Sequence, residues 1–303
     1  MLNKQATLLV SLSKLKGVGN STLRAVLPDI HNGFTLQEIA SKHSKIRKGI
    51  DSTSDHNELL ATDLELCEQS DVEIISVFDN DFPEGLDVSS TAPLFLYLKG
   101  NRELISQKSL AIIGTRSPDS LASQYSSRVA QYFSGSGIPI LSGLALGCDT
   151  LAHEATLDAG GAAIAVLAHG LHMIAPSQNQ RLAERILSSG GLLVSEYPMG
   201  MPPSKFTYVQ RDKIQSALSS ALVLIQSAVD GGSLHACRAS LKSGKKVFFL
   251  PPTDPAKTDI NSEVHSRSDQ VCSLLDCELS DMTNIALLRS KDDYPKVQDA
   301  LTY

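Results

Sequence analysis

The residues of this 303-residue chain that could do chemistry follow short apolar runs, and most of them suit an anion. Gly114-Thr115-Arg116 ends one such run and Ser142-Gly143 ends the next, while Gly231-Gly232-Ser233 precedes a predicted helix. Glycine lets a phosphate approach the backbone closely, and the free amides and dipole at a helix N-terminus favour negative charge. Arg116 adds a planar set of donors that can bind a phosphate bidentately. We therefore expect an anion site, the alternative being that Arg116 pairs with a nearby carboxylate.

No recognisable catalytic or metal-binding set accompanies these residues. The first apolar run is not followed by G-x-G-x-x-G, and the chain has no H-E-x-x-H and no G-x-S-x-G. His153 follows Asp149 within one predicted helix, where it is expected to pack or brace a loop. Cys272 and Cys277 form a close pair with no second pair of ligands, which argues against a zinc site. We expect no catalytic residue, no metal ion and no cofactor.

A sheet is needed to bring these loops together, and the chain from residue 108 onward predicts one. The predicted strands have the sequences SLAIIG, IPILSG, AAIAVLA, LLVSE, ALVLIQSA and KVFFLPP. The predicted helices between them lie near 119–134, 149–159, 178–189, 208–218 and 233–243. Strands that are apolar nearly throughout are buried on both faces, which predicts a Rossmann-like, doubly wound and mostly parallel α/β fold. Ligands of such sheets bind at the carboxyl ends of the strands, near a topological switch point.

Three units are expected along the chain. Residues 1–65 predict a small helical domain of the helix–hairpin–helix or SAM-like kind. Its turn at Gly17-Val18-Gly19 could meet a phosphate, although we favour a purely structural turn. Residues 66–260 are assigned to the Rossmann-like domain, including the strand-rich stretch that precedes it. Residues 261–303 are expected to be a short C-terminal extension.

Composition bounds the class of protein and the place of a polyanion site. A hydrophobic content of 42% is ordinary for a globular chain, and the absence of long apolar stretches argues against a membrane span or a signal peptide. Five scattered cysteines fit reduced thiols, so we expect a cytoplasmic protein. The net charge of −6 divides into +3 for residues 105–255 (12 Lys and Arg, 9 Asp and Glu) and −9 for the rest (15 and 24). A polyanion site therefore belongs in the middle of the chain.

Six motifs in order resemble the running signature of the Smf/DprA (DNA-processing protein A) family. They read LAIIGTR (110–116), SGLALGCDTLAH (142–153), GGAAIAVLAHGL (160–171), LLVSEYPMG (192–200), YVQRDK (208–213) and GGSLHAC (231–237). The resemblance covers roughly residues 5–252. It implies a bacterial cytoplasmic homodimer that binds single-stranded DNA without cutting it. It also implies a RecA-type recombinase as a partner, in DNA recombination and natural transformation.

The resemblance also assigns roles to individual residues. Arg116 matches the DNA-contacting arginine, and Ser142 with Gly143 matches the second phosphate loop. Arg211 and Lys213 match two basic residues of an R-N-R segment. Tyr208 stands where the family has phenylalanine, and an aromatic ring there can stack on a base.

Several positions depart from the family pattern. Asp212 replaces the asparagine of R-N-R, and Ala175 replaces a tyrosine. We expect no C-terminal winged-helix domain after about residue 280. Arg211 and Lys213 would share one face of an extended segment, with Asp212 opposite, whereas a helix would separate them. We expect Asp212 to point away from the binding groove. If it points into the groove, it favours a ligand that carries a donor group.

Two other classes of function stay open. One is a nucleotide sensor, or a nucleotide hydrolase, of the wider LOG/Smf superfamily. Hydrolysis is disfavoured because the LOG motif needs a glutamate in the helix after the fifth strand, where GGSLHACRAS has no acidic residue. Glu196 is the only carboxylate at a strand end that could substitute. The other class is a scaffold that has lost its ligand and acts through a partner protein in a mobile-element or defence setting.

Overall fold

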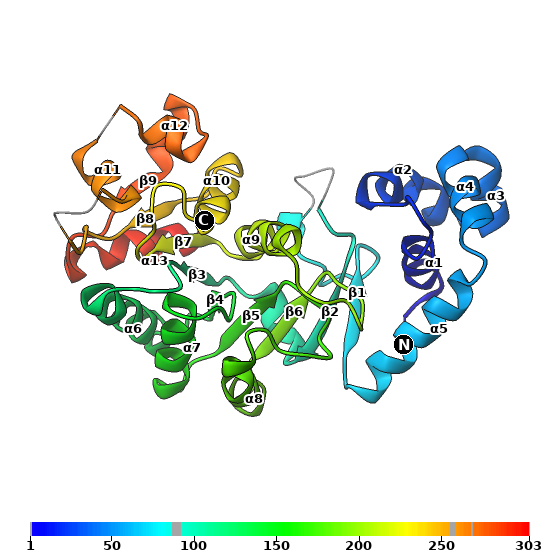
Figure 1. Cartoon of the computed structure of the whole chain (residues 1–303), viewed down its shortest axis with the longest axis horizontal. Coiled ribbons are helices and arrows are strands. Elements are labelled where there is room, and N and C mark those ends of the chain that lie inside the picture. The colour runs from blue at the N-terminus through cyan, green and yellow to red at the C-terminus, as the bar shows by residue number, and fades with distance from the viewer. Residues whose placement is uncertain (1, 87–91, 255–257, 268, 303) are drawn as a thin grey trace.

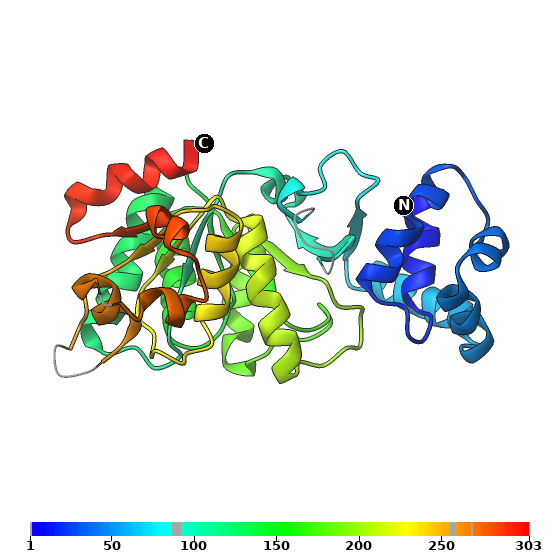
Figure 2. The same ribbon diagram turned by 90° about the horizontal axis from the view of Figure 1, so that it is seen from above.

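The computed structural model describes residues 2–86, 92–254, 258–267 and 269–302. Its N-terminal helices form a separate bundle at one end of an elongated molecule, and the sheet with its covering helices forms the other end (Figures 1 and 2). The bundle consists of α1 (Lys4–Ser13), α2 (Asn20–His31), α3 (Leu36–Lys42), α4 (Ser44–Ser52) and α5 (His56–Gln69). The last helix runs past residue 65, where we had placed the domain boundary. Gly17, with φ +79°, makes the turn between α1 and α2.

One sheet contains all nine strands of the described part of the chain, in the order β1-β2-β6-β5-β4-β3-β7-β8-β9. The strands are β1 (Glu73–Ser76), β2 (Phe95–Gly100), β3 (Leu110–Ile113), β4 (Ile140–Ser142), β5 (Ala163–Leu167), β6 (Leu192–Ser195), β7 (Ala221–Leu224), β8 (Val247–Phe249) and β9 (Ile285–Leu287). From β6 to β9 all neighbours are parallel, while β2 pairs antiparallel with both β6 and β1. The predicted Rossmann-like, mostly parallel fold is confirmed.

Helices cover both faces of this sheet because successive side chains of each strand point to opposite faces. The helices are α6 (Ser120–Gly135), α7 (Cys148–Asp158), α8 (Gln180–Ser188), α9 (Lys205–Leu218) and α10 (Leu234–Lys242). In β3, Ala111 and Ile113 pack with α9 and α10, whereas Leu110 and Ile112 pack with α6 and α7. Figure 1 shows α6, α7 and α8 on one side of the sheet and α9 and α10 on the other.

The C-terminal segment contributes to the same sheet and the same core, which goes beyond the short extension that the sequence predicted. Strand β9 pairs in parallel with β8. It is accompanied by α11 (Ile260–Ser266), α12 (Val271–Leu275) and α13 (Tyr294–Thr302). Val297 of α13 is fully buried against the layer of α6. The residues after 260 are therefore a structural part of the α/β domain.

A buried polar cluster ties the N-terminal bundle to the sheet. The Asp63 carboxylate of α5 pairs with Lys14 Nζ of α1 and accepts hydrogen bonds from Tyr97 Oη of β2 at 2.6 Å and from the Met199 amide at 2.9 Å. Asp63 is 4% exposed, so these donors compensate a charge that is removed from water. The cluster joins four segments that are far apart in the sequence.

Candidate nucleic-acid interface

The switch point of the sheet carries a cavity of about 470 Å³. The chain proceeds from β3 through β4 and β5 to β6 in one direction and then crosses over to β7 on the other side of β3. The loops after β3 and β7 therefore diverge, and a hollow forms between them. The end of β3 and the loop after it supply residues 113–116, and the segment after β7 supplies residues from 227 to 236. Ala145 and Asp149 line the cavity from the segment after β4, and α9 supplies the remaining wall. The cavity thus lies at the carboxyl ends of the strands, where the sequence predicts a ligand site.

Arg116 and Tyr208 lie together at this cavity. The Arg116 guanidinium sits 5.0 Å from the centre of the Tyr208 ring, within cation–π range. Arg116 is exposed and Tyr208 is half-buried. The structure gives Arg116 no carboxylate ion pair among the described residues, so the alternative reading of this arginine as one half of a salt bridge is not supported. A free cation beside an aromatic ring suits a phosphate next to a base.

The loop between β7 and α10 forms the opposite wall. Gly231, Gly232 and Ser233 line the cavity, and Ser233 makes no capping hydrogen bond to the N-terminus of α10. Its hydroxyl instead donates to Ser227 Oγ at 2.7 Å. A Cβ atom at Gly231 would lie 2.2 Å from that same Ser227 Oγ, so a larger residue there would displace the Ser227 hydroxyl. The Gly231 amide donates to Ala228 O at 3.0 Å, so the amides of Gly232 and Ser233 are the ones that remain for an anion.

The loop after β4 does not play the predicted part. Ser142 is fully buried and its hydroxyl donates to Ile112 O at 2.6 Å. The Gly143 amide donates to Asp149 Oδ2 at 3.1 Å. The carboxylate of Asp149 thus occupies the place that we expected a phosphate to take. The structure therefore corrects the expectation that Ser142 and Gly143 contact a phosphate. The signal in the sequence was Asp149 at the start of a predicted helix, where an acidic side chain accepts from backbone amides.

The basic segment after residue 207 lies in α9, in agreement with the helix predicted at 208–218, and the helix separates its two cations. Arg211 and Asp212 line the cavity, whereas Lys213 does not, because neighbours two positions apart on a helix point in different directions. The predicted pairing of Arg211 and Lys213 in one site is therefore corrected. So is the expected orientation of Asp212, which faces the cavity and not away from it.

Arg211 has a structural position at the floor of the cavity. It is 5% exposed, its Nη1 donates to Val166 O at 3.1 Å, and its Nε lies 3.0 Å from Asp212 Oδ1. A Cβ atom at Gly143 would lie 1.5 Å from Arg211 Nη1, so glycine is required for the arginine to pass. The Arg211 charge therefore compensates the carboxylates of Asp149 and Asp212 as well as being available to a ligand.

Burial perturbs the acidic and imidazole groups around Arg211. Desolvation raises the pKa of Asp149 to about 6 despite the nearby arginine, and it also raises the pKa of Asp212. Burial lowers the pKa of His153 to about 3, and neither ring nitrogen has a partner among the described residues. A neutral, enclosed imidazole fits the packing role that the sequence predicted.

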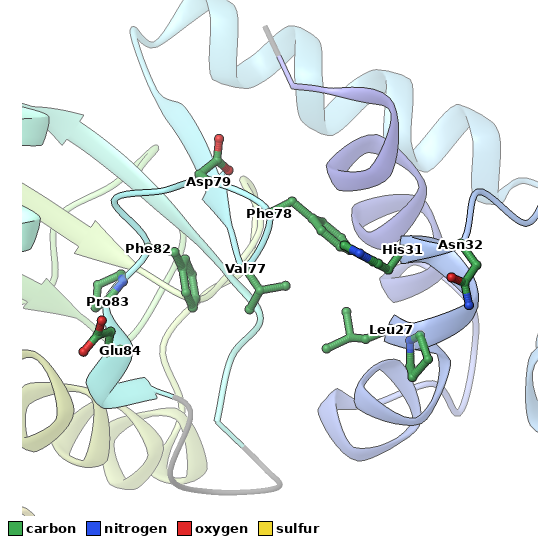
Figure 3. Close-up of a pocket in the computed structure, with 10 residues that line it drawn as sticks. Leu27, His31, Asn32, Val77, Phe78, Asp79, Phe82, Pro83 and Glu84 are labelled. Atoms are coloured by element: carbon green, nitrogen blue, oxygen red, sulfur yellow. The ribbon is translucent and has the colours of Figure 1, made fainter.

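Other hollows are less suited to a polyanion. A groove of about 560 Å³ separates α2 from residues 77–84, and Figure 3 shows His31 and Phe78 extending toward one another across it. Asp79 and Glu84 line this groove, and no described lysine or arginine does. The described residues contain no group of three or more His, Cys, Asp and Glu placed to hold a metal ion. Within the same ranges, no helix combines the length and apolar character needed to cross a membrane.

Comparison with known proteins places the chain among DNA-processing proteins. The model of the family described as DNA recombination-mediator protein A matches residues 73–276. Protein Smf of Escherichia coli (strain K12) is 33% identical over 221 residues, which are 72% of this chain and 56% of that protein. DNA processing protein DprA of Streptococcus pneumoniae is 34% identical over 176 residues, covering 58% and 62%. The chain therefore spans less than two thirds of the length of these curated relatives.

Solved structures agree with this comparison. The X-ray structure of DprA from Streptococcus pneumoniae has a TM-score of 0.75 and 25% identity, with 98% of both chains covered. DNA processing protein A from Helicobacter pylori has a TM-score of 0.58 and 26% identity, with 68% of this chain and 94% of that chain covered. The latter structure is described as revealing a unique single-stranded DNA binding mode.

Proposed function

Because the chain belongs to the DNA recombination-mediator protein A family, as its motifs predicted, we propose that it binds single-stranded DNA at the switch-point cavity and does no chemistry on it. The observation that carries the proposal is the exposed Arg116 stacked on Tyr208 beside an uncapped helix N-terminus. An arginine for the phosphate and a ring for an unpaired base are the two parts that single-strand recognition requires. The solved Helicobacter pylori relative, described as binding single-stranded DNA, supports the same class of ligand.

The proposed contacts are fewer than the sequence suggested. Gly114, Thr115 and Arg116 meet one phosphate, and Gly231, Gly232 and Ser233 meet the next. Tyr208 stacks on the base between them, and Arg211 holds the floor in place. Absence of chemistry is proposed because the described α10 carries no carboxylate that could act as a general base or nucleophile. A homodimer and a RecA-type recombinase partner belong to the same proposal and rest on the family alone.

The test is Arg116→Ala, measured by fluorescence anisotropy with a labelled single strand at two salt concentrations. Loss of one charge-assisted contact should weaken binding by about tenfold or more. It should also reduce the slope of log K against log salt concentration by about one. Arg181→Ala, an exposed arginine on α8, is the matched control and should bind as the wild type does. Equal affinity of the wild type and Arg116→Ala would remove this cavity from DNA binding.

A second function, the sensing of a free nucleotide, is favoured by one observation. Asp212 and Asp149 bring two carboxylates to the cavity, and an acceptor-only group suits a ligand that also carries N–H donors. The discriminating experiment is Asp212→Asn. A single-strand binder should gain affinity for the oligonucleotide when the carboxylate is removed, whereas a sensor should lose its affinity for a nucleoside monophosphate, read by calorimetry.

A further inference from the structure

A second cavity, of about 530 Å³, lies between α9 and α10 on the other side of α9 from the switch-point cavity. We call it the α9–α10 cavity. Its lining includes two residues that the sequence marks as candidates and the first site leaves unused, Glu196 after β6 and Lys213 of α9. His235 of α10 lines it as well. Its volume falls in the range of sites that take small molecules or single nucleotides.

Helical spacing explains why α9 serves two cavities. Residues 208, 211, 212 and 215 line the switch-point cavity, and residues 210, 213, 214 and 217 line the α9–α10 cavity. Each set has the i, i+3, i+4, i+7 spacing of one helix face. On α10, residues 235, 238, 239 and 242 repeat that spacing toward the second cavity, and His235 lines both. The two hollows are therefore neighbours that share one side chain.

Cations predominate around this cavity. Lys213, Arg238 and Lys242 line it, against the exposed Asp276, which pairs with Lys242 Nζ at 2.6 Å. Lys213 Nζ donates to the neutral Gln210 Oε1 at 3.2 Å and forms no ion pair with a described carboxylate. An anionic group such as a phosphate would therefore find at least one lysine that is not already neutralised by a carboxylate.

One carboxyl group stands in contrast to these cations. Glu196 Oε1 is shielded from solvent and has no hydrogen-bond partner among the described residues. A buried acceptor without a donor costs free energy, which a ligand N–H would recover. Burial raises the pKa of Glu196, while a hydrogen bond with Tyr197 and the charge of Lys213 oppose that shift. The ionised carboxylate is an acceptor only. Apolar residues complete the walls, including Leu86, Pro93 and Ile214.

We propose that the α9–α10 cavity is a second nucleotide subsite, in which Lys213 meets a phosphate and Glu196 selects a base that carries an amino group. Cytosine offers the carboxyl group an N4 amino donor, whereas thymine presents a carbonyl oxygen at the same position. The apolar wall accepts the flat face of the base. The shared residue His235 makes the occupant the next nucleotide of the strand held at Arg116, so this subsite rests on the proposed function.

The test compares matched-length oligodeoxycytidine and oligothymidine by fluorescence anisotropy. The wild type should bind oligodeoxycytidine more tightly by about fivefold or more. In Glu196→Gln the amide can pair with either base, so the preference should fall to about twofold or less. Lys213→Ala should weaken binding of both oligonucleotides and keep the preference, while Lys291→Ala on the exposed 3-10 turn before α13 is the charge control.

The outcomes separate this inference from the function on which it rests. Failure of the wild type to bind either strand overturns the proposed function itself. Binding that depends on Arg116 but shows no base preference, or a preference unchanged in Glu196→Gln, overturns the subsite alone. Calorimetry with deoxycytidine monophosphate distinguishes the source of the nucleotide: Glu196-dependent binding of the free nucleotide, with no Glu196 effect on the oligonucleotides, overturns the assignment to the strand. Thermal melting confirms that Glu196→Gln is folded.

Discussion

Replacement of Asp63 by alanine tests how firmly the N-terminal bundle is joined to the α/β domain. The carboxylate pairs with Lys14 of α1 and accepts from Tyr97 of β2 and from the Met199 amide, and all of these groups are shielded from water. Removing the acceptor leaves a buried ammonium group, a buried hydroxyl and a backbone N–H without their partner. The effect should therefore exceed the loss of one hydrogen bond.

The magnitude follows from that count of stranded groups. Breaking a buried ion pair from one side destabilises by about 3–5 kcal/mol, because the remaining charge is left uncompensated. Lys14 is 9% exposed, so solvent offers it little relief. We expect Asp63→Ala to lower the free energy of unfolding by about 4 kcal/mol. An exposed pair provides the contrast: Asp158, 68% exposed, binds Arg185 of α8, and Asp158→Ala should cost about 1 kcal/mol or less.

The assay is chemical denaturation followed by circular dichroism. Lys14→Met added to Asp63→Ala removes the stranded charge and should recover part of the loss, which a double-mutant cycle measures. The proposed role of the cluster fails if Asp63→Ala lowers the free energy of unfolding no more than Asp158→Ala does. It also fails if adding Lys14→Met recovers none of the lost free energy. Either result would mean that the cluster does not join the two parts of the molecule.

Three further outcomes follow from the switch-point cavity. Tyr208→Ala should weaken single-strand binding by about 1–3 kcal/mol while Tyr208→Phe keeps it, measured by anisotropy, because stacking needs the ring and not the hydroxyl. Gly143→Ala should destabilise the fold in thermal melts far more than Gly19→Ala, because its Cβ atom would overlap Arg211 whereas the space at Gly19 is open. The pKa of Asp149 is raised to about 6 from an ordinary value of 3.8, so the folded state binds the proton more tightly than the unfolded state. Its contribution to stability is present below about pH 4 and is lost as the pH rises through 6, by roughly 3 kcal/mol at most. Asp149→Asn should therefore become more stable relative to the wild type across that range, as measured by denaturation at several pH values.

The departures from the family pattern acquire a physical meaning in the structure. Asp212 stands where the resemblance places an asparagine, and it pairs with Arg211 inside the cavity. An additional carboxylate next to a phosphate site weakens the binding of a polyanion and strengthens the binding of a ligand with N–H donors. The same substitution therefore links the proposed DNA binding to the competing hypothesis of a nucleotide sensor, and Asp212→Asn separates the two.

The sequence determined the α/β domain because its signals are local. Apolar runs such as 163–167 and 221–224 are buried on both faces. The continuous apolar composition of each run predicts that burial without reference to the rest of the chain. The turns after β3 and β7 also carry local signals, and Arg116 and Gly232, which the sequence predicts as binding residues, line one cavity. Strand β9 escaped prediction because its three residues are only half-buried and its pairing with β8 depends on a distant segment.

Tertiary structure decided which of the candidate residues share a site. Whether Lys213 joins Arg211 depends on whether the segment is a helix, and the helix sends them to different cavities. Whether Ser142 and Gly143 meet a phosphate depends on Asp149, whose carboxylate folds back to take their place. Both questions concern the direction of side chains and the competition between a ligand and an internal acceptor. The walls that these side chains meet come from segments remote in sequence, so packing decides which helix face borders which loop. The sequence alone therefore predicted the loops but not the contacts.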